Sequence, residues 1–449
     1  MTTTSGTRGR TRLAALVAAA GVVLAGCAAE PTVTSPAPVP SDPVTLKFWH
    51  SAEGATAESL DAIVKDFNDA HVGKITVEAA YQGSYDDTVA KLSAAVQGGS
   101  LPNLVQINDV NTAFMVDSGL VAPAQEAITA AGVDYSADRL APAVANYYSV
   151  DGVLWSMPFQ VSQPAVMVRA DALEATGITA EAFPRTVTEL AAWAQQVKAT
   201  SGKAGISFHL NPWWFEQLTA AAGVAYCTPE NGRGGVRAEA FTLTDPAQLV
   251  QWSALQPLFA DGAALNVGTD FSAAVNGLAS GEVAAIFASS GALGTVTKAM
   301  TTDFVVVPFP IDSPDGGVVP GGNSVFLLDE PSSEAQQAAG AEFLAYLGSD
   351  QVQSDVFAAT GFLPTTLAAL DAAKASANPH QAALLAQLAA TTDSIASAGC
   401  RSGALQGVRG EVGPAIEKVV GGADIATTFA SAEQAAAAVV ADYNARAGR

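Results

Sequence analysis

The hydrophobic pattern of the chain alternates between the period of a strand and the period of a helix. Residues 44–50 (VTLKFWH) predict a strand, and residues 55–71 predict an amphipathic helix. The apolar positions of that helix follow the spacing i, i+3, i+4, i+7 and are Leu60, Ile63, Val64 and Phe67. A strand over 74–81, a helix over 84–99 and a strand over 103–109 come next. This order predicts a parallel sheet with helices on both faces.

The same alternation continues through the rest of the chain. Predicted strands lie at 205–210, 303–310 and 323–328, and the segment 283–294 is an apolar strand that runs into the start of a helix. Predicted helices lie at 213–223, 246–263, 271–282 and 332–349, before an Ala-rich helical tail. We therefore expect an α/β protein. The sequence has neither a P-loop nor a G-x-S-x-G motif, so it carries no such enzyme fingerprint.

Polar residues come directly after three of the predicted strands. Ser51 follows the first strand, Gly83–Tyr85 follows the second and Asp109 follows the third. Ligands of parallel α/β sheets bind beyond the carboxyl ends of the strands. We therefore expect these residues to face one crevice.

The N-terminus has the pattern of a secretory signal. Arg8, Arg10 and Arg12 precede an apolar run over 13–24, which is shorter than the about 20 residues of a membrane-spanning helix. We therefore predict that residues 1–26 are a signal segment that is removed.

The junction after this run carries a cysteine. Residues 24–27 (LAGC) resemble the lipobox of bacterial lipoproteins, which implies that Cys27 is lipid-modified and anchors the mature chain to the membrane. The alternative is an ordinary signal with an incidental cysteine. Residues 27–43 are rich in proline and lack apolar periodicity, so we expect an extended tether.

Composition limits the remaining possibilities. About 400 residues follow the tether, which is more than one core usually holds and natural for two domains. The chain is 49% hydrophobic and 14% charged, and no second apolar run reaches membrane-spanning length. A formal net charge of −22 disfavours nucleic acid and anionic membrane surfaces as partners.

Cysteine and histidine usage bears on crosslinks and metals. With Cys27 set aside, Cys227 and Cys400 are an even pair in an oxidising compartment, which predicts a disulfide. Two buried free thiols are the alternative. The four histidines (His50, His71, His209 and His380) lack the spacing of metal ligands, so we expect no metal and no other cofactor.

Several phrases of the sequence together resemble a known family. They are FWHSAEG, YQGSYDDTVAKLSAAVQGGSLPNLVQIND, MPFQVSQPAVMVRADAL, PGGNSVFLL and ATGFLPTT. They are similar to the family 1 extracellular solute-binding proteins of bacterial ABC importers over most of 44–422. WHSAEG with GSYDD, and CRSGALQGVR near the end, resemble the binders of glycerol-3-phosphate and glycerophosphodiesters.

This resemblance implies the two-lobed, maltose-binding-like fold of type II periplasmic binding proteins, which close on ligand about a hinge. The expected first lobe holds 44–155 and 318–360, and the expected second lobe holds 158–311 and 361–449. The chain is expected to cross between lobes near 155–159, 307–312 and 360–363.

The same resemblance suggests which residues bind ligand. Arg401 matches the arginine that binds phosphate, and a planar guanidinium can bind phosphate with two hydrogen bonds. The alternative is a surface arginine paired with an acidic residue. Tyr85 and Asp109 match the tyrosine and the acidic residue that bind glycerol hydroxyls.

Small and aromatic residues form a second group of candidates. Ser162, Ser289 and Ser290 offer hydroxyl groups, and Gly321 and Gly322 allow close approach of the backbone. The choice between Ser289 and Ser290 stays open.

A tryptophan pair supplies the aromatic candidates. One of Trp213 and Trp214 is expected to form a wall of the pocket, and the other to lie in the core. The sequence departs from the family at Phe362, where the glycerophosphate-binding relatives usually have tyrosine, so one phosphate donor is missing.

Three classes of function are to be distinguished. The first is a non-catalytic, lipid-anchored, monomeric receptor outside the cytoplasmic membrane that delivers a glycerophosphodiester or glycerol phosphate to the permease of an ABC importer. The second is the same receptor with an oligosaccharide ligand. The third, an enzyme, lacks clustered metal ligands and any supporting motif. We therefore expect a small-molecule receptor.

Overall fold

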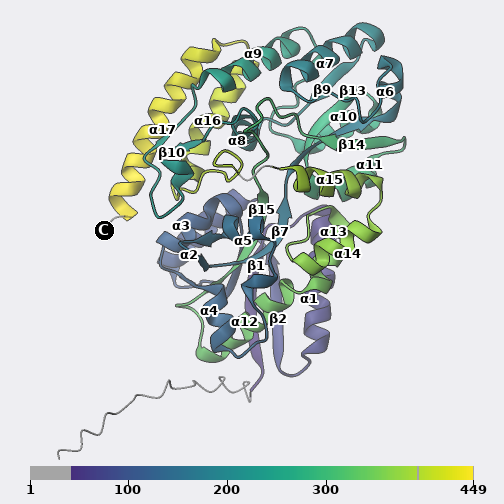
Figure 1. Cartoon of the computed structure of the whole chain (residues 1–449). Helices are drawn as coiled ribbons and strands as arrows, with labels where there is room; N and C mark the ends of the chain where they lie inside the picture. The colour runs from purple at the N-terminus through teal and green to yellow at the C-terminus, as the bar shows by residue number, and fades with distance from the viewer. Residues whose placement is uncertain (1–41, 392–393, 448–449) are drawn as a thin grey trace, which may run out of the picture. The chain divides into compact units, whose positions relative to one another are not determined.

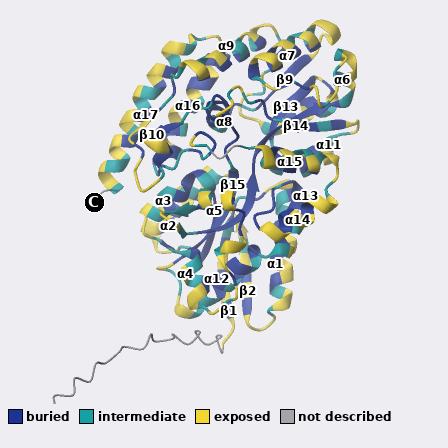
Figure 2. Ribbon diagram, in the orientation of Figure 1, coloured by how far each residue is buried: buried dark blue, intermediate teal, exposed yellow. Residues whose placement is uncertain are grey.

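A computed structural model describes residues 42–391 and 394–447 (Figure 1). The predicted signal segment, Cys27 and all but the last two residues of the predicted tether lie outside the described residues. Two mixed β-sheets, each with helices packed against it, form the framework of the described chain. The strands of both sheets are largely buried, whereas the helices are exposed on their outer sides (Figure 2).

The six helices predicted with explicit bounds are present within three residues of those bounds, whereas others, such as the helix over Val187–Ser201, were not predicted. The α-helices are α1 (Gly54–Ala70), α2 (Tyr85–Gly98), α3 (Thr112–Asp117), α4 (Ala124–Ala130), α5 (Pro142–Tyr148), α6 (Ala170–Thr176), α7 (Val187–Ser201), α8 (Pro212–Ala221), α9 (Pro246–Ala260), α10 (Phe271–Ser280), α11 (Leu293–Ala299), α12 (Glu334–Leu347), α13 (Asp350–Thr360), α14 (Leu367–Ser376), α15 (Pro379–Ala390), α16 (Leu405–Val420) and α17 (Ile425–Ala447). Short 3₁₀ turns are η1 (Asp109–Asn111), η2 (Ala137–Arg139), η3 (Glu230–Gly232) and η4 (Ser290–Ala292).

The start of α2 shows why a helix begins at this point of the chain. The hydroxyl of Ser84 accepts a hydrogen bond from the backbone N–H of Asp87, and the Asp87 carboxylate accepts one from the N–H of Ser84. This capping box satisfies backbone donors that the first turn leaves free. At the other end, Gly99 has a positive φ of 72°, the left-handed conformation that favours glycine after a helix.

The first sheet has the strand order β2-β1-β3-β15-β4, and β7 also pairs with β15. Its strands are β1 (Val44–His50), β2 (Ile75–Tyr81), β3 (Leu104–Asn108), β4 (Val121–Ala122), β7 (Met157–Ser162) and β15 (Gly321–Leu328). Strands β1, β2 and β3 are parallel, as predicted. The sheet is nevertheless mixed, because β15 runs antiparallel to β3, β4 and β7.

Alternating side chains of this sheet enter two different cores. Leu104 and Leu327 pack with α1, α4 and α12 on one face. Val105 and Phe326 pack with α2 and α3 on the other. Helices therefore cover both faces, as the strand–helix alternation predicts.

The second sheet has the order β12-β9-β13-β8-β14. Its strands are β8 (Pro164–Arg169), β9 (Ala204–Ser207), β12 (Ala264–Leu265), β13 (Val283–Ser289) and β14 (Phe304–Pro308). Phe287 packs with α7, α8 and α9 on one face, and Ile286 packs with α10 and α11 on the other. Two small hairpins pair β5 (Ser149–Val150) with β6 (Val153–Leu154) and β10 (Cys227–Thr228) with β11 (Ala240–Phe241).

The chain passes between the sheets at places that differ in part from those expected. Strand β7, assigned from 158 onward to the second lobe, pairs with β15 in the first sheet. Helix α14 contacts α13, and its buried residues Leu370 and Ala373 share a core with Ile286 of the second sheet. All residues from Met157 to Arg169 are buried, and only Gln163 separates β7 from β8. The hydrophobic pattern of this run therefore does not mark where the chain changes sheet.

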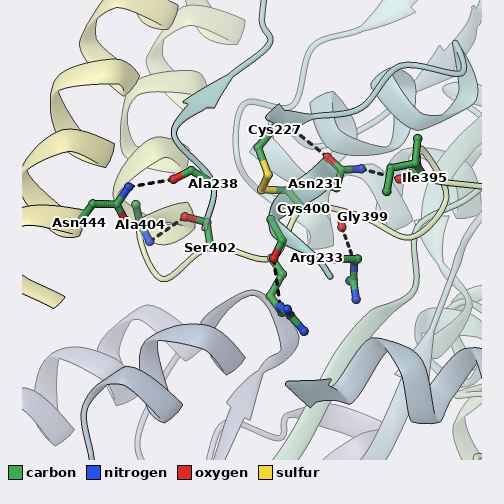
Figure 3. Close-up of a disulfide and its surroundings, with 12 residues drawn as sticks. Cys227, Asn231, Arg233, Ala238, Ile395, Gly399, Cys400, Ser402, Ala404 and Asn444 are labelled. Atoms are coloured by element: carbon green, nitrogen blue, oxygen red, sulfur yellow. Dashed lines mark hydrogen bonds between the residues drawn. A yellow bond between two sulfur atoms is a disulfide. The ribbon is translucent and has the colours of Figure 1, made fainter. Parts of the chain in front are cut away.

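A disulfide joins Cys227 and Cys400, whose Cα atoms lie 5.6 Å apart (Figure 3). It fastens the β10–β11 hairpin to the segment that precedes α16. Asn231 reinforces this junction, because its side chain accepts from the N–H of Cys227 (2.8 Å) and donates to the carbonyl of Ile395 (2.5 Å). Among the described residues, no helix has the length and apolar character needed to cross a membrane.

Candidate functional site

A cleft of about 780 Å³ lies where strand ends of the two sheets come together. The first sheet contributes the residues that follow β1, β2 and β3, together with Ser162 and Gly322 at the ends of β7 and β15. The second sheet contributes Ser289 at the end of β13 and the first residues of α8. Helix α16 adds one further wall. The volume is within the range of small-molecule sites.

Tyr85 and Asp109, both predicted from the strand ends, line the first-sheet side of this cleft. The hydroxyl of Tyr85 accepts a hydrogen bond from the side-chain amide of Asn323 at 2.8 Å. Burial raises the pKa of Tyr85 to about 12, so its hydroxyl stays protonated at neutral pH. Ser51, which also follows a strand, does not line the cleft and instead hydrogen-bonds Thr88 (2.7 Å).

The carboxylate of Asp109 is buried beside a tyrosine that the sequence analysis did not identify. The hydroxyl of Tyr147, on α5, donates a hydrogen bond to it. Burial raises the pKa of Asp109 to about 6, although the nearby Arg409 and the Tyr147 hydrogen bond act in the opposite direction. Asp109 therefore titrates close to neutral pH and is mostly ionised at pH 7.

The arginine that lines the cleft is Arg409, and not the predicted Arg401. Arg409 forms two hydrogen bonds with Glu216 on α8, at 2.6 and 2.8 Å. The Arg409 and Glu216 side chains are only 14% and 6% exposed. Burial alone would lower the pKa of Arg409, but the attraction of Glu216 and Asp109 raises it above its ordinary value. The guanidinium is a permanent cation beside Asp109.

Arg401, predicted to bind phosphate, does not line the cleft and makes its contacts elsewhere. Its guanidinium donates to the carbonyls of Ser149 (3.1 Å) and Gly232 (3.2 Å) and lies 3.4 Å from a carboxylate oxygen of Asp151. These contacts tie the segment after the disulfide to the β5–β6 hairpin and to η3, and Arg401 is not among the residues that line the cleft. Both arginines belong to the phrase CRSGALQGVR, but only Arg409 lies on α16.

The tryptophan pair divides between site and core. Trp213 lines the cleft, and its ring lies close enough to Gly321 that a Cβ there would approach a ring carbon to 3.0 Å. Trp214 is fully buried and packs against Phe287 and Phe309, so it cannot contact a ligand in the cleft. Consecutive residues of a helix point in different directions, which is why only one can line the site.

The serine and glycine candidates divide in a similar way. Ser289 lines the cleft, whereas Ser290 is fully buried and its hydroxyl accepts from the N–H of Gln163 at 3.2 Å. Gly322 lines the cleft, and Gly321 lies beneath Trp213 without lining it. Gly322 has a φ of 110°, and a Cβ there would come within 1.9 Å of the carbonyl of Gln160.

Phe362, where the family resemblance implies a tyrosine, lines the cleft. Its ring packs on Gly291, where an added Cβ would lie 2.4 Å from a ring atom. The ring therefore fills space next to the start of η4 and donates no hydrogen bond. With the Phe362 ring in this place, position 291 has no room for a side chain larger than that of glycine.

The charged residues of the cleft are mostly acidic. In the part of the chain that the structure describes, Glu53, Asp86 and Asp109 line it together with a single cation, Arg409, whose charge is already matched by Glu216. Among the described residues, no group of three or more histidine, cysteine, aspartate or glutamate side chains is placed to hold a metal ion.

Comparisons with known proteins agree with this architecture. Residues 62–383 match the model of the family described as bacterial extracellular solute-binding protein. The sn-glycerol-3-phosphate-binding periplasmic protein UgpB of Rhizobium meliloti (strain 1021) is 28% identical over 395 residues, which cover 85% of this chain and 90% of that protein. UgpB of Escherichia coli (strain K12) is 28% identical over 334 residues, which cover 73% and 75% of the two chains.

Solved structures show the same fold. UgpB from Mycobacterium tuberculosis in complex with glycerophosphocholine superposes with a TM-score of 0.76 at 22% identity and covers 89% of this chain and 99% of that chain. The GacH receptor of Streptomyces glaucescens, solved unliganded and with acarbose, superposes with a TM-score of 0.75 at 19% identity, with the same coverage. These likenesses confirm the fold class expected from the sequence.

Proposed function

The chain belongs to the bacterial extracellular solute-binding proteins, and on this premise we propose that it captures a glycerophosphodiester, such as glycerophosphocholine, for an ABC importer. The observation that supports this ligand class is the grouping of Tyr85, Asp109 and Arg409 on the cleft. A hydroxyl and a carboxylate suit glycerol hydroxyls, and a guanidinium suits a phosphate. The UgpB relatives are named for a ligand of the same chemistry.

The charge of the cleft favours a diester over a phosphate monoester. Glycerol-3-phosphate carries close to two negative charges at neutral pH, and it would face Glu53, Asp86 and Asp109 with one paired arginine to balance them. Glycerophosphocholine has one negative and one positive charge. Its cationic group can lie against the carboxylates or over the face of Trp213.

The replacement at Phe362 fits the same choice. Without a tyrosine hydroxyl at this position, the phosphate loses one donor, and Arg409 and Ser289 remain as donors on the cleft. A phosphodiester has two unesterified oxygens instead of three and needs fewer donors than a monoester.

An oligosaccharide is the second candidate. Trp213 offers an aromatic face for a sugar ring, and the carboxylates offer acceptors for its hydroxyls. The fold neighbour GacH was solved with acarbose, an oligosaccharide-like ligand. If the ligand is an oligosaccharide, the Arg409–Glu216 pair would hold α16 against α8 without binding the ligand.

The setting of the protein follows from the family and the N-terminal sequence. We propose that it is a monomeric, non-catalytic receptor outside the cytoplasmic membrane, held there by a lipid on Cys27. Ligand binding would draw the two sheets together about the connecting strands, and the closed form would deliver its ligand to a permease.

A calorimetric titration of the purified chain from Ser41 onward tests the ligand. The probes are glycerophosphocholine, glycerol-3-phosphate, maltose and trehalose. We expect glycerophosphocholine to bind more tightly than glycerol-3-phosphate and the sugars not to bind. At 100 times its Kd, a ligand adds about 2.7 kcal/mol to the free energy of unfolding, which a thermal shift detects.

The charge pair supplies the matched variants. Glu216→Gln/Arg409→Gln removes both buried charges together, so neither is left unpaired, and should abolish phosphodiester binding. Arg401→Gln removes an arginine that does not line the cleft and should leave the affinity unchanged. Binding of sugars alone, unaffected by the double substitution, would overturn the phosphodiester proposal.

A further inference from the structure

Three buried amide side chains lie beneath Tyr85 and belong to neighbouring strands of the first sheet. Gln106 is on β3, Gln160 on β7 and Asn323 on β15, and all three are fully buried. We infer that they form a positioning network that holds the Tyr85 hydroxyl as a hydrogen-bond donor toward the ligand. This inference rests on the proposed function only in taking the cleft to be the ligand site.

The orientation of the network is set by one backbone group. The N–H of Ser51 lies 3.0 Å from the side-chain oxygen of Gln106. A backbone N–H can only donate, so it requires the Gln106 oxygen on its side and directs the Gln106 amide nitrogen the other way. If Gln106 were flipped, two donors would face each other in a buried place, which is costly.

The orientation of Gln106 in turn determines the orientation of Asn323. The Gln106 nitrogen is 3.0 Å from the side-chain oxygens of both Gln160 and Asn323, so both oxygens accept. The Asn323 nitrogen must then face the remaining neighbours, and it lies 2.9 Å from the Gln160 oxygen and 2.8 Å from the Tyr85 hydroxyl. The orientations of Gln106 and Asn323 are therefore fixed. The Gln160 oxygen accepts from both, while the buried Gln160 nitrogen has no hydrogen-bond partner among the described residues.

The end of the chain of hydrogen bonds is the tyrosine. Because Asn323 donates to Tyr85, the phenol oxygen acts as an acceptor on its buried side. The phenol hydrogen is then free to point into the cleft that Tyr85 lines. Tyr85 therefore offers its proton to an acceptor atom of the ligand, such as a hydroxyl, ester or phosphate oxygen.

The sheet places the three amides close together. Asn323 pairs with Gln160 on β7, next to a register shift between Asn323 and Ser324, and Val325, two residues further along β15, pairs with Gln106 on β3. The three amides thus come from adjacent strands, with Gln106 offset from Asn323 by two residues along the sheet. Strand β7 leads directly into the second sheet through β8, so the network lies at a connection between the sheets.

A double-mutant cycle separates positioning from general loosening. Gln106 does not line the cleft, so Gln106→Met should act on affinity only through Tyr85. We expect it to weaken glycerophosphocholine binding by about tenfold in calorimetry. In the Tyr85→Phe background the same substitution should change the affinity by less than twofold.

A second buried glutamine provides the matched control. Gln353 on α13 is fully buried, and its side chain hydrogen-bonds the backbone of Phe159, Leu347 and Thr365 instead of Tyr85 or the three amides. Gln353→Met should lower the Tm as Gln106→Met does but leave the affinity unchanged. An equal loss of affinity from Gln106→Met in both backgrounds would overturn the inference, as would no loss in the parent chain.

A measurement without ligand keeps this test independent of the ligand proposal. By NMR, the side-chain amide protons of Asn323 should exchange slowly with solvent in the parent chain and faster in Gln106→Met. Fast exchange in the parent chain would refute the network. If maltose binds in place of glycerophosphocholine, the cycle is run with maltose, and only the phosphodiester proposal fails.

Discussion

Asp109 shows how the position of one residue in the fold changes its chemistry. It follows a strand, as the sequence predicts, but its burial and its neighbours Arg409 and Tyr147 are set by the fold. Burial raises the pKa of Asp109 to about 6, from an ordinary value near 4. Its charge state therefore changes within an accessible pH range.

This titration predicts a pH-dependent affinity. A ligand hydroxyl that donates to ionised Asp109 stabilises the charged form, so binding lowers the pKa of Asp109 and releases a proton below pH 6. The affinity for glycerophosphocholine, which does not itself titrate between pH 4 and 7, should be constant above pH 7 and fall up to tenfold per pH unit below 6. Calorimetry at several pH values measures this slope.

The control for this prediction is Asp109→Asn, which should bind more weakly but with a flat pH profile. The stability of the unliganded chain should depend on pH in the opposite sense to the affinity. Because the pKa of Asp109 is raised in the folded state, its contribution to stability is full below pH 4 and is lost as the pH rises through 6. A parent chain whose affinity is independent of pH would contradict the first expectation, and an unliganded chain whose stability is the same in the parent and in Asp109→Asn at every pH would contradict the second.

At the scale of elements, the disulfide fastens a hairpin to the start of a helix that reaches the cleft. It links residues 173 apart in sequence, between β10 and the segment before α16. Helix α16 carries Arg409. The crosslink thus supports the element that places the cation, although neither cysteine lines the cleft.

Removal of this crosslink should cost stability and leave ligand binding nearly intact. Cys227→Ala/Cys400→Ala is expected to lower the free energy of unfolding by roughly 4–5 kcal/mol in the chain-entropy model, because the closed loop is long. Urea denaturation measures the loss. The affinity of the double variant for glycerophosphocholine should stay within about twofold, since Arg409 keeps its pairing with Glu216. A large loss of affinity would show that the crosslink positions α16.

At the scale of the whole molecule, ion pairs connect elements of the two sheets on either side of the cleft. Asp117 on α3 accepts two hydrogen bonds from Arg237 (2.8 and 2.9 Å) and one from Tyr443 on α17 (2.8 Å). Lys298 on α11 reaches Glu58 on α1 at 2.6 Å. Because α3 and α1 pack on the first sheet, and α17 and α11 on the second, these contacts depend on how closely the sheets approach.

Loss of such a contact should weaken binding by favouring an open form. Arg237→Ala removes the bidentate pair with Asp117 and should lower the affinity for glycerophosphocholine up to about fivefold, mainly through faster dissociation. Arg139→Ala is the matched control, because Arg139 pairs with Asp350 away from the cleft and has a similar exposure, 44% against 49%. Stopped-flow dissociation rates distinguish the two. Equal rates for both variants would contradict this expectation.

The sequence by itself determined the local elements and the strand ends. Strand β1 has the bounds expected from its pattern, and α1 and α2 begin and end within one residue of theirs. Tyr85 and Asp109 could be placed on the cleft because the end of a strand is a local property, set by alternation and turn residues.

Only the tertiary structure decided which of several similar residues reach the cleft. Arg401 and Arg409 share one phrase, yet carbonyl oxygens from distant loops hold the first and Glu216 holds the second in the cleft. The two tryptophans likewise are adjacent in sequence, yet Trp213 lines the cleft and Trp214 lies in the core. Hydrophobic periodicity records whether a side chain is buried, and not which partner, far away in the chain, buries it. The partner is fixed only when the two sheets and their helices pack together.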